Sequence, residues 1–199
     1  MTGPDDVMFS PAVKAEQTRL GSRTMFEDRE FKSEITDDLR QFLAVIDTFF
    51  FATASADGRP YVQHRGGPPG FLRVLNENTI AFADFAGNRQ YITQGNLADN
   101  PKVHLFLIDY AHRQRVKIWG EARVVEGDSA LIAQLMPEGY RARPEQALLI
   151  EVTAWDANCP QHIPQRFEAA DVAAALAERD RRIEALEAEI KRLSAVAPL

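Results

Sequence analysis

The 199-residue chain predicts a mainly β (α+β) fold. We expect a small closed or nearly closed antiparallel barrel of six to seven strands, with peripheral helices and a C-terminal heptad helix. Short apolar runs separated by turn signals between residues 49 and 153 predict the strands. Strands and helices do not alternate regularly, which argues against a doubly wound parallel sheet. Beyond residue 170, apolar residues recur at steps of three and four, which predicts a helix.

Composition excludes several classes of protein. A net charge of -6 and an isoelectric point near 5.3 argue against a general nucleic-acid binder. The single cysteine, Cys159, excludes an internal disulfide and favours a reducing compartment. No apolar run approaches the roughly 18 residues that span a bilayer, and residues 1–20 lack the apolar core of a signal peptide. We therefore expect a cytoplasmic protein with no nucleic-acid and no membrane partner.

Two helices are expected before the barrel. Ser10 followed by Pro11 favours a helix start and Gly21 favours a stop, which predicts a short surface helix over residues 11–20. A second helix is predicted from Glu34 to Asp47 and should pack on a core through one apolar stripe, formed by Ile35, Leu39, Phe42, Leu43 and Ile46.

Seven later segments have the pattern of strands. They cover residues 49–54, 61–65, 71–75, 79–85, 102–110, 116–124 and 147–153. Alternation over nine residues makes 116–124 a long, half-buried strand. Two helices interrupt this region, one at 88–97 with Asn88 as its N-cap and one at 128–136 with Asp128 as its N-cap.

The tail carries a heptad pattern. Leu176, Ile183 and Ile190 occupy a positions, and Val172, Arg179, Leu186 and Leu193 occupy d positions. Glu178–Arg182 and Glu187–Lys191 have the favourable i,i+4 order. About three heptads is the lower limit for a coiled coil, so a coiled coil, packing between subunits and a helix lying on its own barrel all remain open. We divide the chain into a lead (1–33), a barrel domain (34–166) and a helical tail (167–199).

Two segments could bind a phosphate. The first segment, at the end of a predicted strand, consists of Gln63, His64, Arg65, Gly66 and Gly67. Its two adjacent glycines let the backbone approach an anion closely, beside the basic side chains of His64 and Arg65. A sharp turn explains the same glycines equally well. The second segment runs from Asp84 to Gln90, where Arg89 would stand at a helix start, a position that opposes the helix dipole unless an anion lies nearby. An ordinary capped helix remains the alternative.

Two further segments add recognition groups. Residues 112–117, which include Arg115, form a basic strand entry. A loop at 155–166 contains Trp155, Cys159, His162 and Arg166, and such side chains recognise heterocycles. Isolated histidines and the lack of a second cysteine argue against a metal site, and Cys159 lacks the flanking signature of a nucleophile. Together the four segments suit a ligand with a phosphate at one end and a flat heteroaromatic at the other.

The order and spacing of several motifs resemble the pyridoxamine 5′-phosphate oxidase-like family of FMN-binding split barrels, over about residues 49–166. The motifs are Ala52-Thr53, Asp57-Gly58-Arg59-Pro60, Ala81-Phe82, Gly87-Asn88-Arg89-Gln90, Asn100-Pro101-Lys102-Val103 and Arg115 to Ala122. The stretches 64–70 and 158–163 resemble one bacterial subgroup of that family.

The resemblance implies a homodimer that binds two FMN molecules in the subunit interface. It places the strand from Gln63 to Gly67 along the flavin and ribityl chain, and Asp84 near the ribityl. It also places Asn88, Arg89 and the adjoining Gln90 at the phosphate, and Arg115 at the flavin. Trp155 and Arg166 match an aromatic and basic pair that the partner subunit contributes.

The resemblance also implies an FMN-dependent oxidoreductase, with His162 as a candidate hydrogen-bond donor or general acid. Gln90 stands where the oxidase itself has a lysine, and the oxidase's substrate-phosphate residues are not recognisable, so the expected substrate is another small molecule or a redox partner. The alternative function is a non-catalytic flavin- or haem-binding carrier, sensor or electron-transfer protein.

Overall fold

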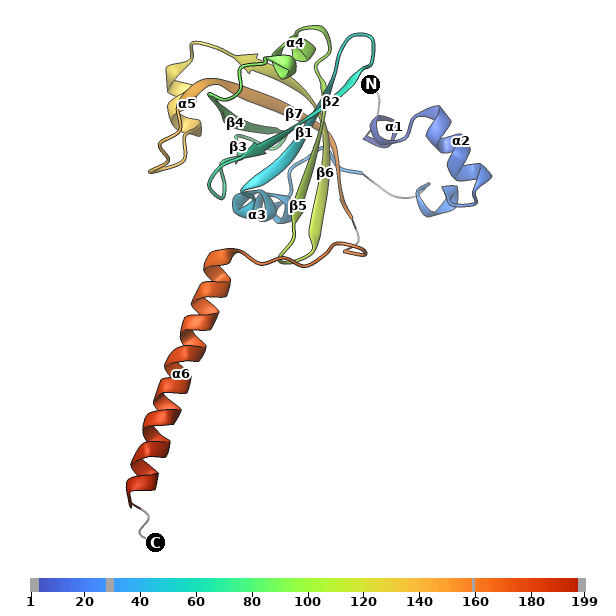
Figure 1. Ribbon diagram of the computed structural model, residues 1–199. Coiled ribbons are helices and arrows are strands. Elements are labelled where there is room, and N and C mark those ends of the chain that lie inside the picture. Colours follow the sequence, from blue (N-terminus) through green and yellow to red (C-terminus); the bar gives the residue numbers. More distant parts are fainter. Residues whose placement is uncertain (1–3, 28–30, 159, 197–199) are drawn as a thin grey trace. The chain divides into compact units, whose positions relative to one another are not determined.

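The computed structural model describes residues 4–27, 31–158 and 160–196 (Figure 1). The chain forms two compact units. The barrel unit comprises the chain up to residue 109 together with 114–160, and the tail unit comprises 110–113 together with the chain from 161 onward. Cys159, whose role the sequence leaves open, lies outside the described residues.

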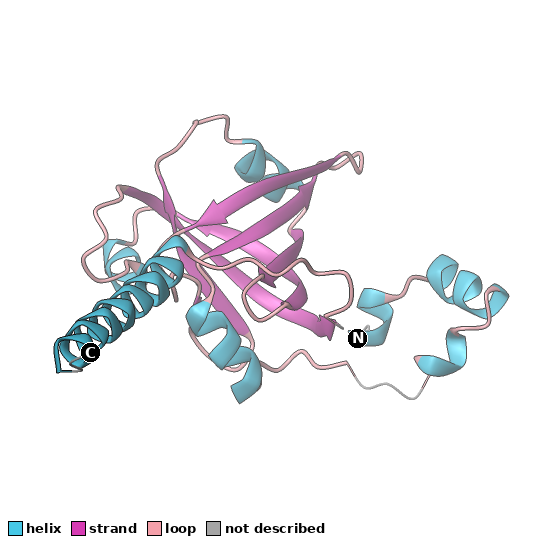
Figure 2. Cartoon of the chain, turned by 60° about the horizontal axis from the view of Figure 1, so that its bottom comes forward, coloured by secondary structure: helices cyan, strands magenta, loops and turns pink. Residues whose placement is uncertain are grey.

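A seven-stranded sheet forms the barrel unit (Figures 1 and 2). Its strands are β1 (Thr48–Ala54), β2 (Pro60–Gly66), β3 (Arg73–Val74), β4 (Thr79–Phe85), β5 (Lys102–Asp109), β6 (Gln114–Val125) and β7 (Pro144–Asn158). Their order is β2-β1-β5-β6-β7-β4-β3, and every neighbouring pair is antiparallel. In the described part of the chain β2 and β3 remain edge strands, so the sheet is not closed. This confirms the predicted fold class, a seven-stranded antiparallel split barrel.

The described chain also contains helices, and three of them begin at side-chain caps that the sequence supplies. The helices are α1 (Pro4–Met8), α2 (Pro11–Arg19), the 3₁₀ helix η1 (Arg23–Met25), α3 (Asp37–Val45), α4 (Ile92–Asp99), α5 (Ser129–Leu135) and, in the tail unit, α6 (Ala169–Val196). Side-chain oxygens of Ser10, Thr36 and Asp128 accept hydrogen bonds from backbone N–H groups three residues later. Because Thr36 caps α3, that helix is shorter than the predicted 34–47. Across the described residues, none of the helices combines the length and hydropathy needed to cross a membrane.

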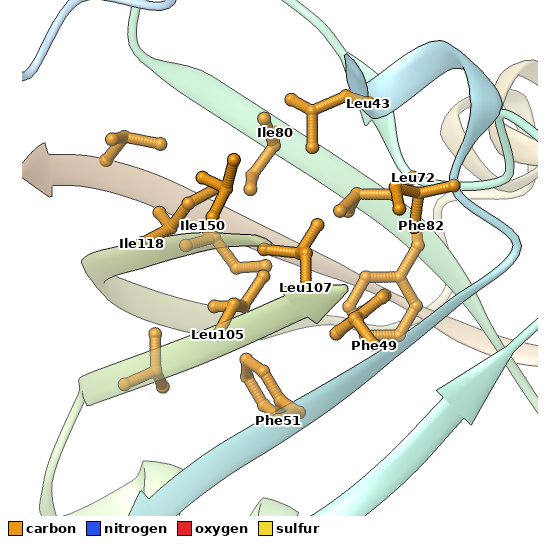
Figure 3. Close-up of a cluster of buried hydrophobic side chains, with 14 of the residues drawn as sticks. Leu43, Phe49, Phe51, Leu72, Ile80, Phe82, Leu105, Leu107, Ile118 and Ile150 are labelled. Carbon is orange, nitrogen blue, oxygen red and sulfur yellow. The ribbon is translucent and has the colours of Figure 1, made fainter. Parts of the chain in front are cut away.

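Buried apolar side chains fill the interior of the barrel unit (Figure 3). Phe49 stacks on Phe71 with ring centroids 5.5 Å apart, and Phe82 meets Phe49 edge-on at 5.4 Å. All five residues of the stripe predicted for the first core helix are buried, which confirms that α3 and its flanks pack on the core. The filled interior leaves only the outside of the sheet for a ligand of flavin size.

Two strands differ in extent from the prediction. Strand β3 has only two residues because a turn, with Phe71 N–H donating to the Pro68 carbonyl at 3.0 Å, holds the start of the predicted segment 71–75 out of the sheet. Strand β7 continues to Asn158, so Trp155 lies in a strand, and the prediction of a loop there is wrong. A register shift between Trp119 and Gly120 keeps β6 and β7 paired beyond the expected strand end.

Gly120 is required where β6 and β7 approach most closely. A Cβ added there would stand 2.5 Å from the Glu151 carbonyl oxygen and 2.9 Å from Ile150 Cγ2. We expect Gly120→Ala to lower the free energy of unfolding by about 2 kcal/mol, because backbone must move to admit the methyl group. Gly95→Ala in α4 is the matched control, since its Cβ would meet nothing within 4 Å and alanine favours the helix. Urea unfolding of both variants checks this, and equal stabilities would contradict it.

His104 makes stability depend on pH. Burial lowers the pKa of His104 below its ordinary value, and the charge of Lys117 lowers it further. The unfolded chain therefore binds the proton more tightly than the folded chain, so the free energy of unfolding falls as the pH drops below about 6.5. We expect His104→Asn to flatten urea-derived stability between pH 7 and pH 5, while His112→Asn at an exposed site preserves the slope. An unchanged slope in His104→Asn would refute this assignment.

Candidate flavin groove

Two hollows adjoin on the outside of the barrel unit, because Gln63, Arg65, Asp84, Phe85 and Gly87 line both, and we treat them together as one groove. We call it the edge groove. Strand β2, the end of β4, the loop 86–91, the start of α4 and Glu145 line it. Eight of the predicted cofactor residues lie along it, namely Gln63, His64, Arg65, Gly66, Asp84, Asn88, Arg89 and Gln90.

An ion pair crosses the floor of the edge groove. Arg65 Nη1 donates to Asp84 Oδ1, and the two side chains are only 13% and 14% exposed. Gln146 Nε2 donates to the other carboxylate oxygen of Asp84 at 2.9 Å, and Gln146 Oε1 accepts a hydrogen bond from Gln94 Nε2. Because β2 and β4 are not neighbours in the sheet, side chains instead of a backbone ladder join the two sides of the split here.

Arg65 retains unused hydrogen-bonding capacity. Its guanidinium carbon lies 5.7 Å from the centre of the Phe82 ring, so one flank rests on the core. Its Nε is buried and has no partner among the described residues. Buried polar atoms are nearly always hydrogen-bonded, so this donor is suited to an acceptor on a bound molecule.

The loop before α4 differs from the prediction. The helix starts at Ile92, with Tyr91 as an uncharged N-cap residue that makes no side-chain capping bond, so the prediction of an N-cap at Asn88 is wrong. Asn88 Oδ1 instead accepts from the Gln90 N–H at 3.2 Å, which closes a local turn. Arg89 and Tyr91 have φ values of 57° and 55°, outside the helical region. Non-glycine residues held in this region are strained, and such strain concentrates at functional sites.

Arg89 places a permanent positive charge at the outer end of the edge groove. Its side chain is 65% exposed, and its Nε donates to Tyr91 Oη at 3.0 Å. That hydrogen bond, followed by the nearby Glu145 carboxylate, keeps the pKa of Arg89 above its ordinary value. Glu145 Oε1 lies 3.5 Å from Arg89 Nη2, so a carboxylate already occupies part of the space that an anionic ligand would take.

The start of the predicted glycine segment borders the other end of the edge groove. His64 is exposed, and its Nε2 lies 2.5 Å from Thr48 Oγ1. Gly67 follows β2, where an added Cβ would stand 2.7 Å from the Phe71 ring. Glycine at 67 therefore lets the chain turn tightly over the core, which is the structural explanation that the sequence left open.

The remaining predicted residues lie elsewhere. Trp155 packs against the core, and its Nε1–H donates to the Glu34 carbonyl at 2.8 Å. Arg115 is the second residue of β6, and its buried Nε has no partner in the described chain. Arg166 and His162 belong to the tail unit, where Arg166 lies 4.5 Å from the Tyr110 ring centre and His162 is exposed with φ 64°. Trp155 and Arg115, which share the barrel unit with the edge groove, do not line it.

Sequence reasoning missed the lining residues Tyr61, Thr93, Gln94 and Glu145, and also Gln146, which donates a hydrogen bond to Asp84. Gln146 is 4% exposed at the start of an apolar strand, and a polar residue beside such a run is a signal that could have found it. Gln94 and Thr93 carry no comparable signal, because only the fold brings α4 beside β2 and β7. Within the residues that the structure describes, no group of three or more His, Cys, Asp or Glu could hold a metal ion.

The sequence match agrees with this architecture. The family model described as pyridoxamine 5′-phosphate oxidase matches residues 35–159, more than half of the chain. This chain belongs to the pyridoxamine 5′-phosphate oxidase family. The matched region contains every predicted residue of the edge groove. No curated protein matches the sequence.

Solved structures of other proteins are similar to this chain in fold. HupZ from Group A Streptococcus is 19% identical, covers 67% of this chain and 99% of its own, and superposes with a TM-score of 0.51. Its H111A variant is 20% identical and covers 62% and 99%, with a TM-score of 0.50. An FMN-binding protein from Syntrophomonas wolfei is 12% identical and covers 74% and 95%, with a TM-score of 0.47. At these identities the two HupZ structures establish the fold alone.

Proposed function

We propose that this protein binds FMN in the edge groove and acts as an FMN-dependent oxidoreductase on a small molecule or redox partner. The observation that carries the proposal is the pair of arginines in one groove, with a buried, unpartnered Nε on Arg65 and an exposed guanidinium on Arg89. The donor set fits the cofactor, because cations bind phosphate and amides such as Gln63 both donate to and accept from hydroxyl groups. Family membership supports the same cofactor.

Each part of the groove would hold a different part of FMN. Arg89 would bind the phosphate together with Asn88 and Gln90, while Asp84 would accept hydrogen bonds from ribityl hydroxyls. The segment 63–67 would lie along the ring system, with Arg65 supplying positive charge. Bound flavin supplies the hydride or electron chemistry, and the protein supplies orientation, electrostatics and exclusion of water.

We further propose that the active form is a homodimer, with a second copy covering the edge groove and contributing Arg115, Trp155 and Arg166. The filled barrel leaves the cofactor on an outer surface, where a partner subunit is needed to exclude water. Phe50 and Val62 support an interface beside the groove, because they project from the outer face of β1 and β2 and remain 38% and 58% exposed.

The test is a titration of the purified protein with FMN, riboflavin and haem, followed by absorption and fluorescence. The proposal expects saturable FMN binding and a weaker complex with riboflavin, which lacks the phosphate. Failure to bind FMN would refute it, and haem binding in its place would favour the carrier or sensor alternative. FMN binding without turnover under NADH or NADPH with electron acceptors would identify a flavin carrier.

His162 is the proposed proton or hydrogen-bond donor to the reacting substrate. Replacing it with alanine should leave FMN affinity unchanged and lower turnover by about a hundredfold or more, the usual contribution of such a donor. His112→Ala is the matched control, because it removes an exposed histidine elsewhere in the tail unit. Stopped-flow reduction checks the rate, and loss of FMN from His162→Ala would make His162 a binding residue instead.

A further inference from the structure

Helix α6 presents an exposed apolar stripe within the tail unit. The helix has 28 residues and so extends about 42 Å (Figure 1). Every side chain described along it, from Ala169 to Ala195, is exposed. Its large apolar residues are 45% to 63% exposed, namely Val172, Leu176, Ile183, Leu186, Ile190 and Leu193. Helices of this kind depend on packing of the apolar face, so a partner is required.

We propose that this partner is α6 of a second copy, in a parallel two-stranded coiled coil. With Arg179 included between Leu176 and Ile183, the stripe advances by alternating steps of four and three, which is the spacing of a left-handed coiled-coil seam. In its second half, Ile183 and Ile190 occupy a positions, while Leu186 and Leu193 occupy d positions. Isoleucine at a with leucine at d is the combination that favours two parallel strands.

The flanking charges select the same arrangement. In a parallel pair, each g residue faces the e residue five positions later on the other helix, which brings Arg182 to Glu187 of the second copy twice. Within the helix, Glu178 pairs with Arg181 in place of the expected Arg182, and Arg192 pairs with Glu189. Arg182 and Glu187 are therefore not engaged by those two intrahelical ion pairs.

An antiparallel pair would bring like charges together at the e positions, because e faces e in that orientation and both charged e residues, Asp180 and Glu187, are acidic. The g positions would also face one another there, with Arg182 and Glu189 of opposite charge, but Glu189 is already paired with Arg192 of its own helix. Arg179, at a d position, would face its own copy in a parallel pair, beside Asp180 of the other helix. A charged residue in the seam lowers stability and fixes the register, which is the usual role of a polar core residue in a coiled coil.

Site-specific crosslinking of the full chain tests the seam. In a Cys159→Ser background, Leu186→Cys places a thiol at d, and Ala188→Cys places one at the outward f position as the matched control. The two positions lie two residues apart on one helix, and a parallel seam brings the d positions of the two copies together while it keeps the f positions apart. We expect at least tenfold more disulfide-linked dimer from Leu186→Cys. Equal crosslinking, or none in either variant, would overturn the proposal.

Charge reversal tests the orientation independently. Glu187→Arg should weaken self-association of the full chain at least tenfold in sedimentation at low salt, and adding Arg182→Glu should restore it. Arg179→Leu should strengthen association. A double variant no better than Glu187→Arg, or weaker association in Arg179→Leu, would contradict the parallel pairing. Neither this readout nor the crosslinking involves flavin, so failure here leaves the proposed cofactor site untouched, and the reverse also holds.

Discussion

Replacing Arg65 with alanine should lower the free energy of unfolding by about 3 kcal/mol and abolish tight FMN binding. The stability loss arises because the Asp84 carboxylate, only 14% exposed, would lose its cation and keep only the hydrogen bond from Gln146. Removing one partner of a largely buried ion pair leaves an uncompensated charge, and such changes rank among the most destabilising. The loss of FMN would follow because the unpartnered Nε of Arg65 disappears with the side chain.

A double variant separates the two effects of Arg65. Combining Arg65→Ala with Asp84→Ala removes both charges, so much of the lost stability should return while FMN affinity remains low. Arg59→Ala is the surface control, because its pair with Asp57 is 3.8 Å long and both side chains are largely exposed. Chemical unfolding and FMN titration of the three variants check these expectations. A double variant as unstable as Arg65→Ala would show that the pair is not the cause.

Arg89→Ala should weaken FMN binding about 10- to 100-fold and leave riboflavin binding nearly unchanged. A charge-assisted hydrogen bond to phosphate contributes about 1.5–3 kcal/mol to binding. Riboflavin lacks the phosphate, so its affinity does not depend on this hydrogen bond. Stability should change little, because the side chain is 65% exposed. The measurement is a pair of titrations with the two flavins.

The control for Arg89 is Arg123→Ala, which removes an equally positive, exposed side chain from β6 outside the edge groove. Both variants change the net charge by the same amount, so a general electrostatic effect would weaken FMN equally in each. A selective loss in Arg89→Ala identifies a phosphate contact. An equal loss of FMN and riboflavin in that variant would place Arg89 away from the phosphate.

Local signals predicted most of the fold. Ser10, Thr36 and Asp128 each cap a helix that the sequence anticipates, because a cap acts within three residues. Alternating apolar residues located β6 within two residues of its ends. The predicted strand at β3 was too long and the predicted strand at β7 was too short. Strand length depends on which partner strand is available for pairing, and no local sequence pattern encodes that.

Eight residues of the edge groove were predictable from the sequence, but its other lining residues and its connections were not. The glycine segment and the region of Arg89 stood out by composition, yet the contact of Arg65 with Asp84 spans 19 positions and joins strands that are not adjacent. The helix expected at Asn88 failed because an asparagine can close a turn as readily as it can cap a helix, and tertiary context chose the turn.

Because the sheet is split, a flavin bound in the edge groove would also affect the stability of the barrel unit. Side chains, chiefly Arg65 and Asp84, join β2 to β4 across the split. The two strands are therefore held together by fewer backbone hydrogen bonds than any pair of neighbouring strands. A ligand that contacts both β2 and β4 would hold the two strands together. A ligand that binds only the folded state raises the free energy of unfolding, and the increase grows with ligand concentration relative to the Kd. Amide protons of β2 should then exchange with solvent more slowly as flavin is added. The bound cofactor would therefore stabilise the folded barrel as well as take part in the reaction.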